Sequence, residues 1–288
     1  MQNHPTIELI RRSDSLPPIP KAFGETLSML LEPFEFNIDE CIEKLSGLPR
    51  LEAALIQVLN YSTILNRKFL TLKDAVLYLG AQNTRMIAIA FLTGLLLPDK
   101  EGKAKIFDNK KYWKHCISTA IAGYMIAEET GLCDKERIFT YGLIHDIGLT
   151  VLDICLPEQL DRICTMHMEK GVHQIVAEKI VLGGITHSEI GMWVCKEWGL
   201  PEEIVEIVGY HHSPLVSCKA CNEVKIMYLA DYISASYYEY LFGTSMTFTY
   251  IDRVRESLDL SGKFIDDIAE RLPEKVESIS RISFFDLE

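Results

Sequence analysis

The sequence has no hydrophobic run long enough to cross a membrane as a helix. Its most apolar stretch, Met86–Leu97, spans twelve residues and is interrupted by Thr93 and Gly94, whereas a membrane-spanning helix needs about 20. The first ten residues also lack the charged start and apolar core of a signal peptide. We therefore expect a cytoplasmic protein that does not enter the membrane, with Met86–Leu97 as a buried core helix.

Runs of basic residues are also absent. The chain of 288 residues has 29 Lys and Arg against 41 Asp and Glu, which gives a net charge of −12. A protein that binds the phosphate backbone nonspecifically needs a basic face, so nucleic acid is not an expected partner. Hydrophobic residues make up 48% of the chain and charged residues 24%, which is an ordinary globular composition. This length suffices for one large or two modest domains with a buried core.

The cysteines do not form a complete metal-binding pattern. All eight are scattered, and Cys218 and Cys221 have the spacing of half a zinc knuckle without a second C-x-x-C pair. A structural zinc site normally needs four such ligands. We interpret this pair as incidental and expect reduced thiols, as in the cytoplasm.

Strand-like alternation of apolar and polar residues is nearly absent, and helical spacing dominates. Apolar residues recur at three- and four-residue intervals, for example at Phe23, Leu27 and Leu30. The segment Pro98–Lys103 contains a proline, a glycine and four charges, a composition that suits an exposed connection. We therefore predict an all-α protein with a boundary at this connection.

The boundary divides the chain into four predicted segments. Residues 1–15 form an N-terminal extension, 16–103 an N-terminal helical subdomain, 104–240 a second helical bundle, and 241–288 a C-terminal helical extension. The N-terminal subdomain is expected to pack on the second bundle. Because residues 16–97 contain no cluster of His, Cys or carboxylates that suggests chemistry, we expect this subdomain to be a docking surface.

The most informative feature is His145–Asp146, within the apolar run Gly142–Gly148. A histidine and an aspartate inside an apolar helix are costly to bury unless they are paired or bind a metal. For an isolated dipeptide, an exposed pair at a helix end or a structural hydrogen bond would be the better explanation. The rest of the chain favours a metal, because further histidines and an aspartate occur in segments that are predicted to be helical or helix-terminal. They are His115, His187, His211, His212 and Asp231.

Local signals indicate where these residues lie. A helix predicted over 110–129 carries His115, and its charge-free run at 120–127 indicates a central position. Asp134 is expected to cap the helix that leads to His145. Thr186–Glu189 has the pattern of a capping box, which places His187 in the first turn of a helix. Five histidines and two aspartates are enough for two metal ions.

This order of residues resembles the HD superfamily of metal-dependent phosphohydrolases. The extra histidines are similar to the fuller ligand set of its two-metal branch, which includes the HD-GYP phosphodiesterases. The N-terminal half is similar to the HDOD domain, a signalling relative of HD, and the resemblance runs from about residue 13 to residue 240. It is carried by Leu16–Pro20, Leu59–Ser62, Leu72–Gly80, Tyr112–His115, Gly142–Gly148, His187–Gly191 and Gly199–Ile204.

The resemblance implies a metal site with a defined division of ligands. Asp146 would bridge two ions; His115, His145 and Asp231 would complete one of them, and His187, His211 and His212 the other. Imidazole and carboxylate ligands suit Fe, Mn, Zn or Ni better than Mg or Ca, so we expect one or two divalent transition metal ions. Without metal, burial and mutual repulsion are expected to raise the pKa values of Asp146 and Asp231.

Three departures from the HD-GYP pattern bear on activity. Leu149 stands where those proteins carry a lysine, Ser213–Leu215 replaces the Gly-Tyr-Pro signature, and Lys111 stands where a two-metal enzyme carries an acidic ligand. We therefore assign no catalytic residue.

Two functions fit the sequence. The first is a bacterial-type signal-transduction protein with a retained HD-like metal site, acting through a signalling protein partner or a phosphate-containing ligand. The second is a metal-dependent phosphohydrolase or phosphodiesterase acting on a nucleotide or cyclic dinucleotide. The leucine at position 149 favours the first, since fold resemblance alone does not establish activity.

Overall fold

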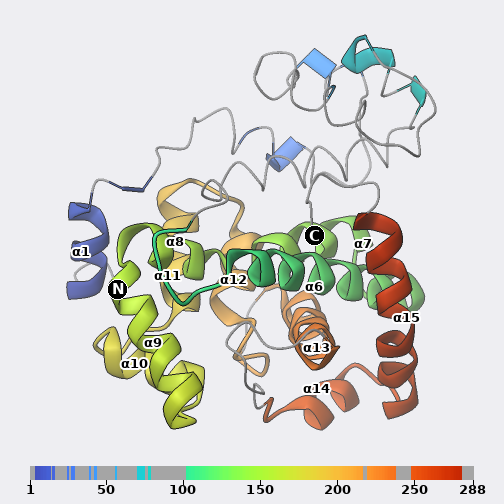
Figure 1. Cartoon of the computed structure of the whole chain (residues 1–288). Helices are drawn as coiled ribbons and strands as arrows, with labels where there is room; N and C mark the ends of the chain where they lie inside the picture. Colours follow the sequence, from blue (N-terminus) through green and yellow to red (C-terminus); the bar gives the residue numbers. More distant parts are fainter. Residues whose placement is uncertain are drawn as a thin grey trace.

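The computed structural model describes residues 4–13, 102–216, 219–237 and 248–280, with a few separate residues between 15 and 78. In this part of the chain every regular element is a helix, so the fold is all-α, as the sequence predicts (Figure 1). The predicted subdomain 16–103, including the helix expected at 86–97, lies mostly outside the described residues. Its packing on the second bundle stays a prediction.

The helices of the described residues follow one another along the chain with short connections between most of them. Their order is α1 (Pro5–Arg12), α6 (Asn109–Thr130), α7 (Lys135–Ile144), α8 (Ile147–Cys155), α9 (Pro157–Lys170), α10 (Gln174–Val181), α11 (His187–Glu197), α12 (Glu202–Tyr210), α13 (Cys221–Tyr237), α14 (Ile251–Ser257) and α15 (Gly262–Ser280).

Helix α6 lies at the centre of the bundle (Figure 1). It begins after Asp108, whose carboxylate accepts hydrogen bonds from two backbone N–H groups of the first turn, and it ends at Gly131, which has a φ of 64°. It packs against α7, α13 and α15. In the charge-free run at 120–127 only Tyr124 is not fully buried. The predicted central position of this helix is confirmed.

Two glycines allow the helices around the His–Asp pair to approach closely. Gly142 on α7 lies against the backbone of Ala120 on α6, so a Cβ at position 142 would overlap the main chain. Gly148 on α8 lies against the carbonyl of His187 at the start of α11, with the same consequence. Glycine at both positions therefore brings α7 onto α6 and α8 onto α11.

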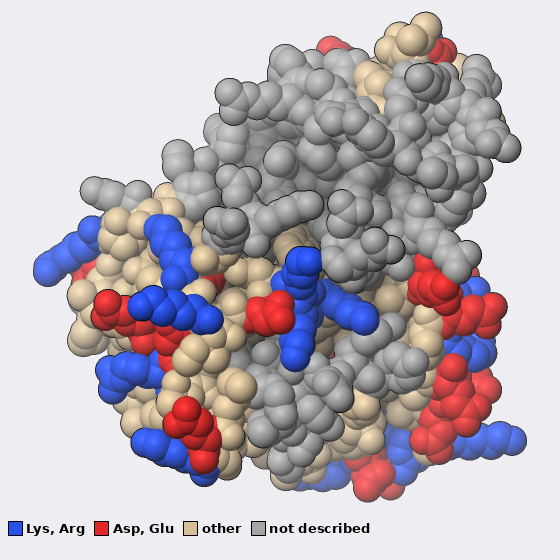
Figure 2. All heavy atoms as spheres, viewed as in Figure 1, with Lys and Arg blue, Asp and Glu red and all other residues tan. Residues whose placement is uncertain are grey.

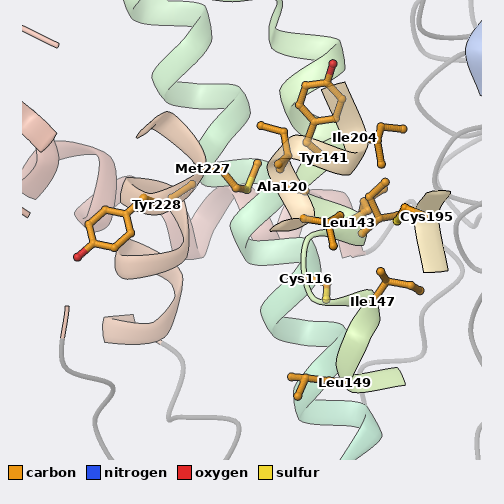
Figure 3. Close-up of a cluster of buried hydrophobic side chains, with 14 of the residues drawn as sticks. Cys116, Ala120, Tyr141, Leu143, Ile147, Leu149, Cys195, Ile204, Met227 and Tyr228 are labelled. Atoms are coloured by element: carbon orange, nitrogen blue, oxygen red, sulfur yellow. The ribbon is translucent and has the colours of Figure 1, made fainter. Parts of the chain in front are cut away.

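Among the described residues an apolar core surrounds this junction (Figure 3). Fully burying one aliphatic side chain stabilises a fold by about 1.5–3 kcal/mol, and α6, α7, α8, α11, α12 and α13 all contribute such side chains. Those labelled in Figure 3 are Cys116, Ala120, Tyr141, Leu143, Ile147, Leu149, Cys195, Ile204, Met227 and Tyr228. Any polar group placed among them loses its water and needs another partner.

One helical stretch of the described chain, Lys135–Cys155, is long and apolar enough by composition alone to cross a membrane. It comprises α7 and α8 with the His–Asp pair between them. In its apolar window 94% of the residues are buried inside the bundle. Packing against neighbouring helices thus accounts for its hydrophobicity, as in the core helix of a globular domain.

Helix α1, within the predicted N-terminal extension, packs beside α8 (Figure 1). Ile7 and Ile10 are buried. The hydroxyl of Thr6 donates to the carbonyl of Leu182 over 2.6 Å, and the His4 ring contacts the carbonyl of Gly183 at 3.1 Å. This short helix is therefore part of the bundle that carries the histidines.

The end of the predicted connection 98–103 is anchored to α8. The ammonium of Lys103 donates to the carbonyl of Ile154 over 2.9 Å, and the backbone N–H of Ala104 donates to the buried carboxylate of Asp153 over 2.7 Å. Residues 98–101 lie outside the described residues, so the position of the boundary stays a prediction.

Beyond residue 240, α14 contacts α13, and α15 returns to α6 and α13. Ile268 and Leu272 of α15 are fully buried, and Arg271 pairs with Glu129 at the end of α6. On the face shown in Figure 2, acidic and basic side chains of the described residues are interspersed. The C-terminal helices therefore complete the bundle around α6.

Candidate metal centre

The structure brings all seven residues predicted for the metal site to one place in the bundle. Different helices and helix ends supply them, so the site exists only in the folded chain. His115 comes from α6, His145 and Asp146 from the junction of α7 and α8, His187 from the start of α11, His211 and His212 from the end of α12, and Asp231 from α13.

The His–Asp pair does not lie inside one helix, and this part of the prediction is wrong. Helix α7 ends at Ile144, His145 caps it, and Asp146 precedes the first residue of α8. The pair nevertheless lies in the interior, with 0% exposure for His145 and 5% for Asp146. The structure therefore excludes the alternative of an exposed pair at a helix end.

One group of donor atoms, the first group, consists of His115, His145 and Asp146. The Nε2 atoms of His115 and His145 are 3.2 Å apart. The Oδ2 atom of Asp146 lies 3.6 Å from the first nitrogen and 3.4 Å from the second. All three side chains direct these atoms to a common point.

The second group consists of His187, His211 and His212 together with the same Asp146. Here the other carboxylate oxygen, Oδ1, lies 3.1 Å from Nε2 of His187 and 3.2 Å from Nε2 of His211. Nε2 of His212 lies 3.2 Å from Nε2 of His187. Asp146 thus faces one group with each of its oxygens.

Asp231 lies between the two groups. Its Oδ1 is 3.2 Å from Nε2 of His115 in the first group, and its Oδ2 is 3.7 Å from Nδ1 of His212 in the second. The resemblance assigned this carboxylate to one ion. Its position adjoins ligands of both.

The outer nitrogens of the imidazole rings are held by acceptors. Nδ1 of His145 donates to the carbonyl of Gly142 over 2.8 Å, and Nδ1 of His211 donates to the carbonyl of Val208 over 2.9 Å. A carbonyl only accepts, so the proton of each ring is on Nδ1. In the neutral ring the Nε2 lone pair then faces inward, as in metal-binding histidines.

Sequence reasoning missed Glu178, which supports His187. This carboxylate on α10 is 0% exposed. It accepts from Nδ1 of His187 over 2.7 Å, from the backbone N–H of His187 over 2.9 Å, and from the amide of Gln174 over 2.9 Å. The sequence signal that could have identified Glu178 is a glutamate among mostly apolar residues in Gln174–Val181. Nothing local connects it to a histidine nine residues further along the chain.

The capping box at the start of α11 is confirmed. The hydroxyl of Thr186 accepts from the backbone N–H of Glu189, and the Glu189 carboxylate accepts from the backbone N–H of Thr186 over 3.0 Å. His187 is the first residue of the helix. The cap thus fixes the backbone from which this histidine points into the site.

The pKa values follow from this arrangement. Burial would raise the pKa of Asp146, but its interactions with His145, His187 and His211 outweigh burial and lower the pKa well below its usual value, so the predicted upward shift is wrong for this residue. Burial lowers the pKa of His145 to about 4. Burial also opposes a charge on His187, but the carboxylates of Glu178 and Asp146 outweigh it and raise that pKa to about 10.

The donor set fits a transition metal. The Oδ1 atom of Asp146 and both carboxylate oxygens of Asp231 are buried and form no hydrogen bond, although imidazole nitrogens lie close to them. Neutral His145 presents a lone pair, not a proton, to the Asp146 carboxylate. Lone pairs that face each other repel, and a divalent cation held by these residues would relieve that repulsion. Nitrogen and carboxylate ligands suit Fe, Mn, Zn or Ni.

The positions that depart from the HD-GYP pattern differ in their surroundings. Leu149 is 0% exposed and belongs to the apolar core, whereas Lys111 lies on the exposed side of α6. Cys218 of the incidental C-x-x-C pair lies outside the described residues. One helical turn after Asp146, where the HD-GYP pattern has a lysine, this chain therefore has a buried aliphatic side chain.

Three solved structures share this fold. An HDOD domain protein from Geobacter sulfurreducens is 24% identical, with a TM-score of 0.73 and coverage of 98% of this chain and 97% of that one. A proposed phosphohydrolase from Shewanella amazonensis SB2B is 20% identical, with a TM-score of 0.70 and coverage of 98% and 100%. A proposed signal transduction protein from Marinobacter aquaeolei VT8 is 18% identical, with a TM-score of 0.78 and coverage of 99% and 62%.

A curated relative extends beyond this chain. An uncharacterized protein of Treponema pallidum (strain Nichols) is 22% identical over 231 residues, which is 76% of this chain and 43% of that protein. This chain therefore spans less than half of the relative's length. Residues 16–214 match the HDOD domain family, and the chain belongs to that family.

Proposed function

We propose that this HDOD protein is a cytoplasmic signal-transduction component whose HD-like metal centre serves regulation. The observation that carries the proposal is a complete donor set in the core, in which the two oxygens of Asp146 face two groups of histidines. It acts through a signalling protein partner or a phosphate-containing ligand. The proposed signal transduction protein from Marinobacter aquaeolei VT8 has the same fold.

The metal centre holds one or two divalent ions of Fe, Mn, Zn or Ni. His115, His145 and Asp146 would hold one ion, and His187, His211, His212 and Asp146 would hold the other. Asp231 supports both groups through His115 and His212. When bound, such ions supply Lewis acidity toward anionic oxygen atoms, for example those of phosphate. The protein contributes the fixed rings, the exclusion of water and the direction from which an anion arrives.

A regulatory role is favoured over catalysis by the groups around the site. Hydrolysis of a phosphate ester needs a group that protonates the leaving oxygen. Leu149, where the HD-GYP pattern has a lysine, offers only a buried hydrocarbon. The carboxylate of Glu189 is held in the capping box by Thr186. Leu149 therefore has no proton to give to the leaving oxygen, and the carboxylate of Glu189 is already occupied.

The alternative is a metal-dependent phosphohydrolase or phosphodiesterase acting on a nucleotide or cyclic dinucleotide. It is favoured by one specific observation, the shared carboxylate between two donor groups. Two-metal hydrolases use that arrangement to bind both the attacking and the leaving oxygen. The proposed phosphohydrolase from Shewanella amazonensis SB2B also has this fold.

Elemental analysis and a substrate panel separate the two functions. The purified protein, loaded with Mn or Fe, is assayed against phosphomonoesters, nucleotides and cyclic dinucleotides. We expect one to two ions per chain and absent or very slow turnover. Robust turnover that disappears in Asp146→Ala and persists in His4→Ala, a histidine outside the site, would establish the phosphohydrolase instead. A protein that binds neither metal would refute both.

A further inference from the structure

A cavity of about 550 Å³ adjoins the second group of the metal centre. Its volume lies within the roughly 300–1,000 Å³ typical of small-molecule sites. His212 belongs to both, because it lines the cavity and also lies 3.2 Å from His187. Its side chain is 17% exposed, whereas those of the other six candidate ligands are at most 7% exposed. Of the seven candidate ligands, His212 is thus the one that faces this cavity.

Part of the cavity wall is aromatic. Tyr210, Tyr228, Phe248 and Tyr250 line it. The ring of Phe248 packs edge-on against Tyr228, with centroids 5.5 Å apart, and the Tyr228 hydroxyl accepts from the backbone N–H of Tyr250 over 2.9 Å. In Figure 3 the Tyr228 ring points away from the core cluster. This wall is preformed and presents the surfaces against which planar rings pack.

The end beside the metal centre favours an anion. Ser188, in the first turn of α11, has its hydroxyl 3.3 Å from Nε2 of His187. The N-terminus of this eleven-residue helix carries the positive end of the helix dipole. Lys179 of α10 adds a cation at the rim. Glu189 also lines the cavity, but its carboxylate is occupied by the backbone and hydroxyl of Thr186.

We propose that this cavity binds a phosphate monoester of a planar ring compound, with the phosphate at His212 and Ser188 and the ring against the aromatic wall. The inference deepens the proposed function and rests on its metal centre, because it names the class of phosphate-containing ligand and the side from which it binds. The metal's positive charge, the helix terminus and Lys179 attract the phosphate. The apolar wall then distinguishes a ring-bearing ester from free phosphate.

The test measures the binding of simple probes to the Mn-loaded protein by isothermal titration calorimetry. The probes are phenyl phosphate, inorganic phosphate and phenol. If both ends of the cavity contribute, phenyl phosphate binds at least tenfold more tightly than either of the other two. Equal binding of phenyl phosphate and inorganic phosphate would overturn the aromatic half of the inference.

A matched pair of substitutions on α10 locates the binding. Val176 lines the cavity and is 49% exposed, and Ile180, one turn later, is 60% exposed and is not among the lining residues. Val176→Trp fills the cavity and is expected to remove the preference for phenyl phosphate while the Mn content stays unchanged. Ile180→Trp is expected to keep both the preference for phenyl phosphate and the Mn content. Tyr250→Ala, at a part-exposed side chain, is a second variant that weakens phenyl phosphate binding only.

The outcomes separate this inference from the proposed function. In one outcome, the native protein and the Val176→Trp and Ile180→Trp variants all bind Mn and have the same affinity for phenyl phosphate. This result overturns the cavity as the ligand site but leaves the metal centre supported. Failure to bind Mn overturns the metal centre and the inference together. Loss of the preference in Val176→Trp and Tyr250→Ala, with Ile180→Trp unaffected, supports it.

Discussion

The two groups of the metal centre differ in their exposure to solvent and in the partners behind their imidazole rings. In the first, His115 and His145 are buried, and their Nδ1 atoms face neutral partners, the Ser234 hydroxyl at 3.2 Å and the Gly142 carbonyl at 2.8 Å. In the second, a buried carboxylate, Glu178, stands behind His187, and His212 is exposed to the cavity. The first group is buried and its rings have neutral partners behind them, whereas the second has a carboxylate behind one ring and another ring open to the cavity.

This difference assigns different tasks to the two groups. A ring supported by a carbonyl stays neutral, whereas a ring supported by a carboxylate becomes a more basic ligand. The pKa values differ in the same direction, because burial lowers that of His145 to about 4, whereas the carboxylates of Glu178 and Asp146 overcome burial and raise that of His187 to about 10. We infer that the second group, which faces the cavity through His212, is the one that meets the ligand.

The largest expected effect comes from removing what the groups share. Asp146→Ala is expected to abolish binding at both groups, whereas His145→Ala and His212→Ala each remove one ion. Metal present at a hundredfold excess over Kd stabilises the folded state by about 2.7 kcal/mol. At ~2–4 °C per kcal/mol, each ion contributes roughly 5–11 °C, so with two ions bound Asp146→Ala loses about twice as much metal-dependent melting temperature as His145→Ala, measured by calorimetry with and without chelator.

Elemental analysis of the same samples provides the check. If Asp146→Ala retains as much metal as His145→Ala, the carboxylate does not connect the two groups. His4→Ala serves as the control for removing a histidine outside the site. If chelation strips the native protein without moving its melting temperature, the ions do not contribute to holding these helices together.

The next effect distinguishes the two groups. Glu178→Gln replaces a charged acceptor by a neutral amide of the same shape, and loss of such a partner behind a metal-binding histidine costs about 10–100-fold in metal affinity. We expect this loss for the second ion only. Titration of the apo protein with Mn, followed by calorimetry, measures both affinities.

Two controls make that comparison specific. Glu136→Gln alters another buried glutamate, in the first turn of α7, and should leave both affinities unchanged. Ser234→Ala removes the neutral partner of His115 and should weaken the first ion by less than Glu178→Gln weakens the second. An equal loss at both ions in Glu178→Gln would show a general effect on folding.

Local rules in the sequence predicted the parts of the site that depend on neighbouring residues. The Thr186–Glu189 cap and the Asp134 cap follow from short-range hydrogen bonds and were found where the sequence placed them. The charge-free run at 120–127 correctly predicted a central helix. The family order of residues identified the seven side chains that the fold brings together.

The features that were missed depend on contacts between distant segments. The break between α7 and α8 occurs within an apolar run, where Gly148 meets the carbonyl of His187 from another helix. Glu178 acquires its role only when α10 packs behind the start of α11. The lowered pKa of Asp146 arises because burial is outweighed by the adjacent His145 together with His187 and His211, which come from two other helices. No local pattern contains these interactions.

The smallest expected effect concerns the cap that orients His187. Thr186→Ala removes the hydroxyl that accepts from the Glu189 backbone, and loss of such a cap typically costs about 1 kcal/mol. Asp134→Ala removes the equivalent cap of α7, where the carboxylate accepts from the Arg137 N–H over 2.8 Å. Both variants should lose similar stability in denaturant unfolding. Only Thr186→Ala should also weaken the second ion, because His187 directly follows this cap, whereas Asp134 lies eleven residues before His145. If both variants change metal affinity equally, the cap acts through global stability and not through the direction of His187.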